Sequence, residues 1–226
     1  MQDFEFERTE TGLRVKGFPD AVGLVCLDEK MASRLADLRL HMNDLAFGLA
    51  CLEEIEKQPG DAWIVRQALW RSAVIHYMKC YGSSDGRPST LNRDAVFRGQ
   101  PEAQNYHDYV DSLRDKHVVH DDNAFAQCIT GAIVNPPNAA RKVENVVCTT
   151  FIVQTYSVED HANMRLLLNN ARDWVSGQYE ECTRKIMQEL EQQPYDALLA
   201  RGAVVYKVPE REDVHKTRTM PRLTKR

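Results

Sequence analysis

The sequence predicts a mainly α-helical protein, a helical bundle with a β-hairpin insertion and a short N-terminal hairpin. Two observations predict this class. Apolar residues recur at three- and four-residue steps over long stretches, which is the spacing that places them on one face of a helix. Two runs rich in β-branched residues, 125–134 and 143–156, instead flank a turn that contains two prolines, and this pattern is typical of a β-hairpin.

The first third of the chain divides into a hairpin and two helices. Polar and apolar residues alternate around a Thr-Glu-Thr-Gly turn within residues 1–27, which predicts the N-terminal hairpin. Residues 28–58 have the spacing of a long amphipathic helix. Pro59 and Gly60 end this helix, and Asp61 stands where it can cap a second helix.

The remaining two thirds contain a polar loop with one short helical turn, a third helix, the hairpin insertion and a long final helix. Pro101 suits the first turn of the third helix, and the aspartates from Asp121 mark its end. Ser157 and Asp160 form a capping signature for the final helix. We therefore expect a single domain over 1–226 that comprises an N-terminal hairpin (1–27), a helical core (28–124), a β-hairpin (125–156), C-terminal helices (157–208) and a mobile tail (209–226).

Composition narrows the classes of function. The net charge of −4 argues against a surface built for broad capture of a phosphate backbone, although it leaves room for a local basic groove. No run of about 18 apolar residues occurs and the N-terminus lacks an apolar signal core, so we expect a cytoplasmic protein without a membrane span. The cysteines are spread without a C-x-x-C pair, which favours reduced, mostly buried thiols over disulfides or a zinc site. They are Cys26, Cys51, Cys80, Cys128, Cys148 and Cys182.

The end of the third helix carries the candidate site, in the run Leu113–Asn123 (LRDKHVVHDDN). On a helical wheel of about 100° per residue, His117 and His120 continue an apolar stripe, with Arg114 at its edge. The stripe predicts a surface buried in a homodimer, formed by Tyr106, Val110 and Leu113 together with neighbouring residues of the same face.

Three interpretations of the histidines stay open. In the first interpretation the histidines are structural, either packed in the core or placed at the polar end of an interface. Alternatively, with Arg114 and Lys116 they form an anion site, because a guanidinium offers a planar fork to phosphate oxygens and histidine moves a proton near neutral pH. A metal site is the weakest interpretation, since the two cationic side chains repel a metal ion.

The run from Arg114 to His120 resembles the arginine, polar residue, several residues, histidine signature of the HEPN superfamily. These proteins are helical bundles, many of them ribonucleases of prokaryotic defence and toxin–antitoxin systems. The bare spacing also occurs from Arg34 to His41 and from Arg71 to His76, but only the third match has an acidic residue, Asp115, directly after the arginine and ends its helix. The resemblance covers roughly residues 28–125. Asp115 and Val119 depart from it, because asparagine and alanine are commoner there.

The resemblance implies a metal-independent, cofactor-free endoribonuclease, usually a homodimer whose two motif helices face each other. His120 would act as general base or acid and Arg114 would stabilise charge on the phosphate. Asp115 would orient one of them, Lys116 would hold a neighbouring phosphate, and His117 would be a second proton carrier or pack against the partner helix. The implied partners are an RNA substrate and an antitoxin protein.

The same family contains members that do not cleave RNA. The runner-up is therefore a non-catalytic nucleotide-binding or protein-interaction module of the HEPN fold. The basic C-terminal run, Lys216 to Arg226, is interpreted first as a solvated tail and second as an arm that steers RNA.

Overall fold

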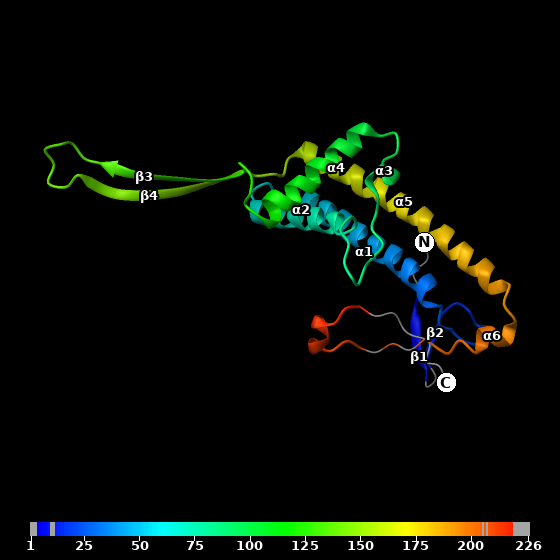
Figure 1. Cartoon of the computed structure of the whole chain (residues 1–226). Helices are drawn as coiled ribbons and strands as arrows, with labels where there is room; N and C mark the ends of the chain where they lie inside the picture. The colour runs from blue at the N-terminus through cyan, green and yellow to red at the C-terminus, as the bar shows by residue number, and fades with distance from the viewer. Residues whose placement is uncertain (1–3, 10–11, 205, 207, 219–226) are drawn as a thin grey trace. The chain divides into compact units, whose positions relative to one another are not determined.

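Helices make up most of the chain that the structure describes, which is residues 4–9, 12–204, 206 and 208–218 of a computed structural model (Figure 1). The mainly α class and the two antiparallel hairpins are confirmed, whereas the HEPN-like fold stays a prediction. In chain order the elements are β1 (Phe6–Thr9), β2 (Gly12–Val15), α1 (Glu29–Lys57), α2 (Trp63–Met78), α3 (Arg93–Val96), α4 (Pro101–Leu113), the π-helix η1 (Arg114–Val119), β3 (Ala126–Val134), β4 (Val143–Ile152), α5 (Val158–Glu191), α6 (Tyr195–Leu199) and the 3-10 helix η2 (Arg211–His215).

Local capping explains where the long helices begin. The Asp28 carboxylate accepts a hydrogen bond from the Met31 amide at the start of α1. The predicted cap of α5 is confirmed, because the Asp160 amide donates to the Ser157 hydroxyl over 3.0 Å. The predicted Asp61 cap is wrong, because α2 starts after Ala62 and no side chain caps it. The Asp61 backbone carbonyl accepts a hydrogen bond from the Trp63 amide over 2.8 Å.

The chain forms two compact units, each assembled from separate stretches, so the predicted single domain stays a prediction. The first unit contains residues 1–44, 80–91 and 171–226, and the second contains residues 45–79 and 92–170. The long helices α1 and α5 contribute residues to both units.

The core of the second unit is apolar and closely packed. A Cβ at Gly48 of α1 would lie 2.9 Å from Cδ2 of Leu168 of α5, so a larger residue there would require the Leu168 side chain to shift. The His161 ring contacts the Leu52 carbonyl over 3.1 Å and ties the start of α5 to α1. The fully buried apolar side chains of this unit include Leu45, Leu52, Trp70, Ala73, Val74, Tyr77, Phe97, Val110, Met164, Leu167 and Leu168.

The first unit combines the start of α1 with the C-terminal segments. Val25 forms an isolated antiparallel bridge with Ala203, and the Arg201 guanidinium contacts the Cys26 carbonyl over 3.5 Å. Residues 211–215 of the predicted mobile tail form η2, and Arg218 is hydrogen-bonded to Gly86. Residues 219–226 lie outside the described residues, so the mobility of the tail stays a prediction.

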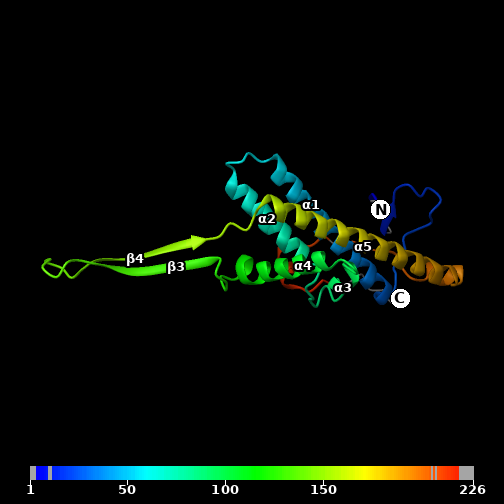
Figure 2. The same ribbon diagram turned by 90° about the horizontal axis from the view of Figure 1, so that it is seen from above.

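The insertion is a long two-stranded ribbon, drawn in green in Figures 1 and 2. Its strands pair antiparallel from Ala126 opposite Ile152 to Val134 opposite Val143, with an irregularity near the tip. Side chains on both faces are exposed, including Cys128 and Cys148. This corrects the expectation of mostly buried thiols, because only Cys26, Cys51 and Cys80 are buried.

No helix among the described residues is both long enough and apolar enough to cross a membrane.

Candidate functional site

Helix α4 leads the chain into the candidate site and is itself anchored in the core of the second unit. Pro101 occupies its first turn, as the sequence predicts. The His107 ring is buried and contacts the Tyr77 hydroxyl through Nδ1 over 2.7 Å. Burial lowers the pKa of His107, so this histidine is neutral at pH 7 and serves packing.

The residues predicted to form a dimer contact make contacts within the chain itself. Val110 and Leu113 are buried inside the chain's own core. The Tyr106 hydroxyl donates to Asp160 of α5 over 3.0 Å, and its burial raises the pKa of Tyr106. The apolar stripe therefore already has a partner within the same chain, and a second chain could reach Val110 or Leu113 only if this core opened. The homodimer itself stays a proposal.

The motif does not continue α4 as a regular α-helix. Residues Arg114–Val119 form a π-helix, which has a wider turn, is found mostly as short segments and is frequent at functional sites. His120 then leaves the helix with φ −127° and ψ 153°, an extended conformation. A wheel of constant angle consequently fails over these residues: His117 stays on the buried face, while His120 is exposed.

His117 is the most unusual group of the site. Its side chain is buried, with 3% of its surface exposed, and its ring meets the Phe125 ring edge-on at 5.6 Å between centroids. Neither ring nitrogen has a hydrogen-bond partner among the described residues. Buried polar atoms are nearly always hydrogen-bonded in proteins. The hydrogen-bonding capacity of this ring is therefore unsatisfied within the described part of the chain.

Arg114 lies at the start of η1 between two carboxylates. Its guanidinium nitrogens lie 3.4 Å from Asp111 and 3.5 Å from Asp115, and its Nε is buried without a hydrogen-bond partner among the described residues. Both ion pairs are long and partly exposed, so each contributes little energy. The guanidinium can therefore leave them for an anion of better geometry, such as a phosphate.

The other predicted site residues, Asp115, Lys116 and His120, are all exposed at this end of the second unit. The Lys116 carbonyl accepts the Asp122 amide over 2.9 Å, which closes the end of η1 with backbone rather than side-chain contacts. The structure thus brings Arg114 and Asp115 into contact, buries His117, and leaves the side chains of Lys116 and His120 open to solvent.

The described residues include no group of three or more His, Cys, Asp or Glu side chains that could hold a metal ion.

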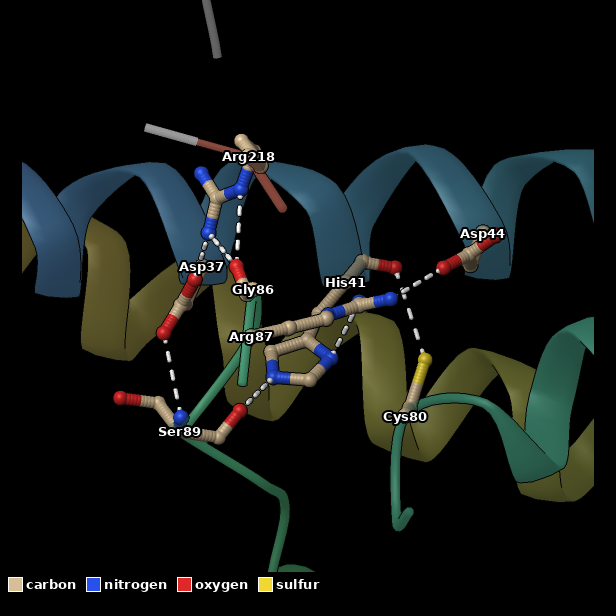
Figure 3. A network of polar contacts seen from close by, with 8 residues as sticks. All are labelled: Asp37, His41, Asp44, Cys80, Gly86, Arg87, Ser89 and Arg218. Carbon is tan, nitrogen blue, oxygen red and sulfur yellow. Dashed lines mark hydrogen bonds and ion pairs between the residues drawn. The ribbon is translucent and has the colours of Figure 1, made fainter. Parts of the chain in front are cut away.

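A second polar cluster lies in the first unit, among residues that were not predicted to form a site (Figure 3). Asp37, His41 and Asp44 lie on α1 and are all buried. The Arg87 guanidinium donates to His41 Nδ1 and to Asp44, each over 2.5 Å. Because Nδ1 accepts, Nε2 carries the proton and donates to the Ser89 carbonyl over 2.8 Å.

The same cluster holds the C-terminal segment. Asp37 accepts hydrogen bonds from the Ser89 amide over 3.1 Å and from Arg218 over 2.5 Å. Burial, reinforced by the positive charge of Arg87, lowers the pKa of His41 to about 4. A neutral, enclosed histidine with both nitrogens bonded is suited to anchoring the loop around Arg87, not to proton transfer at pH 7. The signal in the sequence was the spacing of Asp37, His41 and Asp44 on one helix face.

No protein-family model, no curated protein and no solved structure matches this chain.

Proposed function

We propose that this chain is a metal-independent endoribonuclease of the HEPN type, acting in a prokaryotic defence or toxin–antitoxin setting in the cytoplasm. The observation that supports the proposal most directly is the π-helical end of α4, where Arg114 sits loosely paired and His120 is exposed one residue beyond the helix. A cation with replaceable partners can stabilise charge on a phosphate, and an accessible imidazole can transfer a proton, which are two of the roles in metal-independent phosphodiester cleavage.

The reaction that these groups support is transphosphorylation. A base removes the proton of the RNA 2′-hydroxyl, and the 2′-oxygen forms a bond to phosphorus. The bond from phosphorus to the 5′-oxygen breaks, and that oxygen takes up a proton. His120 serves as base or acid in this sequence, while Arg114 stabilises the negative charge on the non-bridging oxygens. Asp115 orients Arg114, to which it is paired, and Lys116 holds a neighbouring phosphate.

The acidic surroundings favour a runner-up. Asp111 and Asp115 partly neutralise Arg114, and Asp121 and Asp122 follow His120 directly. Such a surface repels a polyanion and suits a protein partner with basic side chains. The alternative is therefore a non-catalytic HEPN-fold module that binds a nucleotide or a protein such as an antitoxin.

Cleavage of a panel of structured and single-stranded RNAs, with excess EDTA present, tests the proposal. We expect cleavage of at least one RNA, with 2′,3′-cyclic phosphate at the product ends. His120→Ala should reduce the rate by about 10²–10⁴-fold, the usual contribution of an essential acid or base. Arg114→Ala should cost a comparable factor, because the charge on the phosphate is no longer stabilised.

The matched controls are His215→Ala and Arg211→Ala, which remove an exposed histidine and an exposed arginine of η2. Both should cleave like the wild type. An inactive wild-type protein on the whole panel supports the binding module, and cleavage that EDTA abolishes rules out the metal-independent mechanism.

A further inference from the structure

The β3–β4 ribbon, residues 126–152, is an arm whose surface is unlike the rest of the molecule. Between Asp122 and Glu159 the chain has only three charged side chains, whereas 27% of all its residues are charged. These three are Arg141, Lys142 and Glu144, all near the tip of the arm. The strands themselves carry exposed apolar side chains: Ile129, Ile133, Val134, Val143, Val146, Val147, Phe151 and Ile152.

Neither face of the arm is covered by the described part of the chain. Residues opposite each other in an antiparallel pair share a face, so Ile129 and Thr149 lie on one face while Ala132 and Val146 lie on the other. Val146 is 72% exposed. A two-stranded hairpin of this kind is marginally stable alone in water, and exposed apolar surfaces of this extent mark interaction sites.

The edges of the arm are open as well. Within the described residues, β3 and β4 pair only with each other. Isolated edge strands normally carry lysine, proline or other charges that prevent further pairing. β3 contains no charged residue and no proline, and Glu144 is the single charge of β4. The arm is therefore suited to cover by another protein surface.

The charges at the two ends of the arm indicate which protein surface covers it. The tip has Arg141 and Lys142, with Glu144 hydrogen-bonded to Asn135. The base has Asp121 and Asp122 before β3, and no lysine or arginine lies between residues 121 and 140 or between 145 and 164. Basic tip and acidic base are separated by the length of nine residues, about 30 Å in a strand.

We infer that the arm pairs with the arm of a second copy of this chain through the face that carries Ala132 and Val146, the two lying antiparallel so that the tip of each meets the base of the other. In this arrangement Arg141 and Lys142 of one copy approach Asp121 and Asp122 of the other at both ends. The uncharged surface between them is covered by an identical uncharged surface. Of the parallel and antiparallel orientations, only the antiparallel one brings opposite charges together at both ends.

The inference rests on the arm alone and not on the proposed ribonuclease activity. It does have a consequence for that site, because Asp121 directly follows His120. In the antiparallel pair, Arg141 and Lys142 of one copy lie near His120 of the other. The two histidines lie at opposite ends of the paired arms. Each site would then be completed by a tip and not by a facing motif helix.

Sedimentation velocity of the full chain at 1–100 µM provides the first test. We expect a reversible dimer for the wild type and a monomer for Val146→Lys, which places a charge in the covered surface. The matched control is Val214→Lys, which makes the same change at a residue of η2 that is 77% exposed; it should remain a dimer. Circular dichroism establishes that each variant keeps its helix content.

Charge reversal tests the antiparallel orientation. A tip-reversed chain (Arg141→Glu with Lys142→Glu) has two acidic ends, and a base-reversed chain (Asp121→Lys with Asp122→Lys) has two basic ends. Each alone should dimerise at least about tenfold more weakly than the wild type, since like charges meet at both ends. An equimolar mixture of the two should recover a heterodimer, because every end then meets its opposite.

Three results would overturn the inference. They are a wild type that is monomeric at 100 µM, a Val146→Lys variant that dimerises like the wild type, and a mixture of charge-reversed chains that stays monomeric. If the wild type is monomeric, co-sedimentation with phosphatidylcholine vesicles tests whether the arm binds a lipid surface instead of a second copy. A monomer that binds vesicles, and loses this binding on Val146→Lys, assigns the arm to a lipid surface.

Discussion

The Arg87 guanidinium donates to Nδ1 of His41 over 2.5 Å, although 46 residues separate the two in the chain. This contact selects the tautomer in which Nε2 donates to the Ser89 carbonyl, and so it fixes the loop after Cys80 against α1. A protonated His41 would have no lone pair for Arg87 and would place two cations in contact. The fold of the first unit therefore depends on a neutral histidine.

The pH dependence of stability follows from this arrangement. The pKa of His41 is about 4 in the folded protein and 6.5 in the unfolded chain. Between these values the unfolded chain binds the extra proton, so stability present above pH 6.5 is lost as the pH falls toward 4. Relative to His41→Gln, the wild type should lose on the order of 2 kcal/mol over this window, measured by urea unfolding. His215→Gln, which changes an exposed histidine, should keep the full wild-type dependence; an equal loss in His41→Gln would contradict the assignment.

Arg218 should act as an anchor for the C-terminal segment. Its guanidinium is bonded to the buried Asp37 carboxylate and to the Gly86 carbonyl. Arg218→Ala leaves Asp37 with the Ser89 amide but without its cation, and we expect a loss of about 1–3 kcal/mol in the free energy of unfolding. The control is Arg211→Ala, an exposed arginine of the same segment, which should change stability by less than about 0.5 kcal/mol. Equal stability of the two variants would show that Arg218 does not hold the segment.

The burial of Leu113 predicts an effect on folding. Leu113→Ala should lower the free energy of unfolding by about 2–5 kcal/mol, because it removes apolar contacts and leaves a cavity in the core of the second unit. Val119→Ala, at an exposed position of η1, should cost much less. If Leu113 formed a dimer contact instead, its truncation would shift the dimer dissociation constant and leave the unfolding of the monomer unchanged.

His117 should lower the free energy of unfolding relative to an apolar residue at the same position. Its ring is buried beside Phe125 and neither nitrogen has a hydrogen-bond partner among the described residues. His117→Leu replaces it with an apolar side chain of similar volume, so we expect stability to rise by about 1 kcal/mol in urea or thermal unfolding. His120→Leu, at an exposed position, should give no such gain. A marked loss of stability in His117→Leu would contradict this prediction.

The sequence determined the elements of this protein, because each depends on neighbours in the chain. Apolar spacing predicted α1 and α2, and the β-branched runs predicted the arm. The Ser157 cap and the Pro101 start were predictable for the same reason, since both act within one helical turn.

The tertiary structure decided which faces are covered and by what. The same stripe that suggested a dimer contact through Val110 packs into the chain's own core, and a regular spacing cannot distinguish these two partners. The change from α4 to a π-helix separated His117 from His120, whereas a wheel of constant angle keeps them together. Arg218 and Asp37 meet across 181 residues. Such contacts depend on how distant segments fold back on each other, and their energy comes from burial that local sequence patterns do not encode.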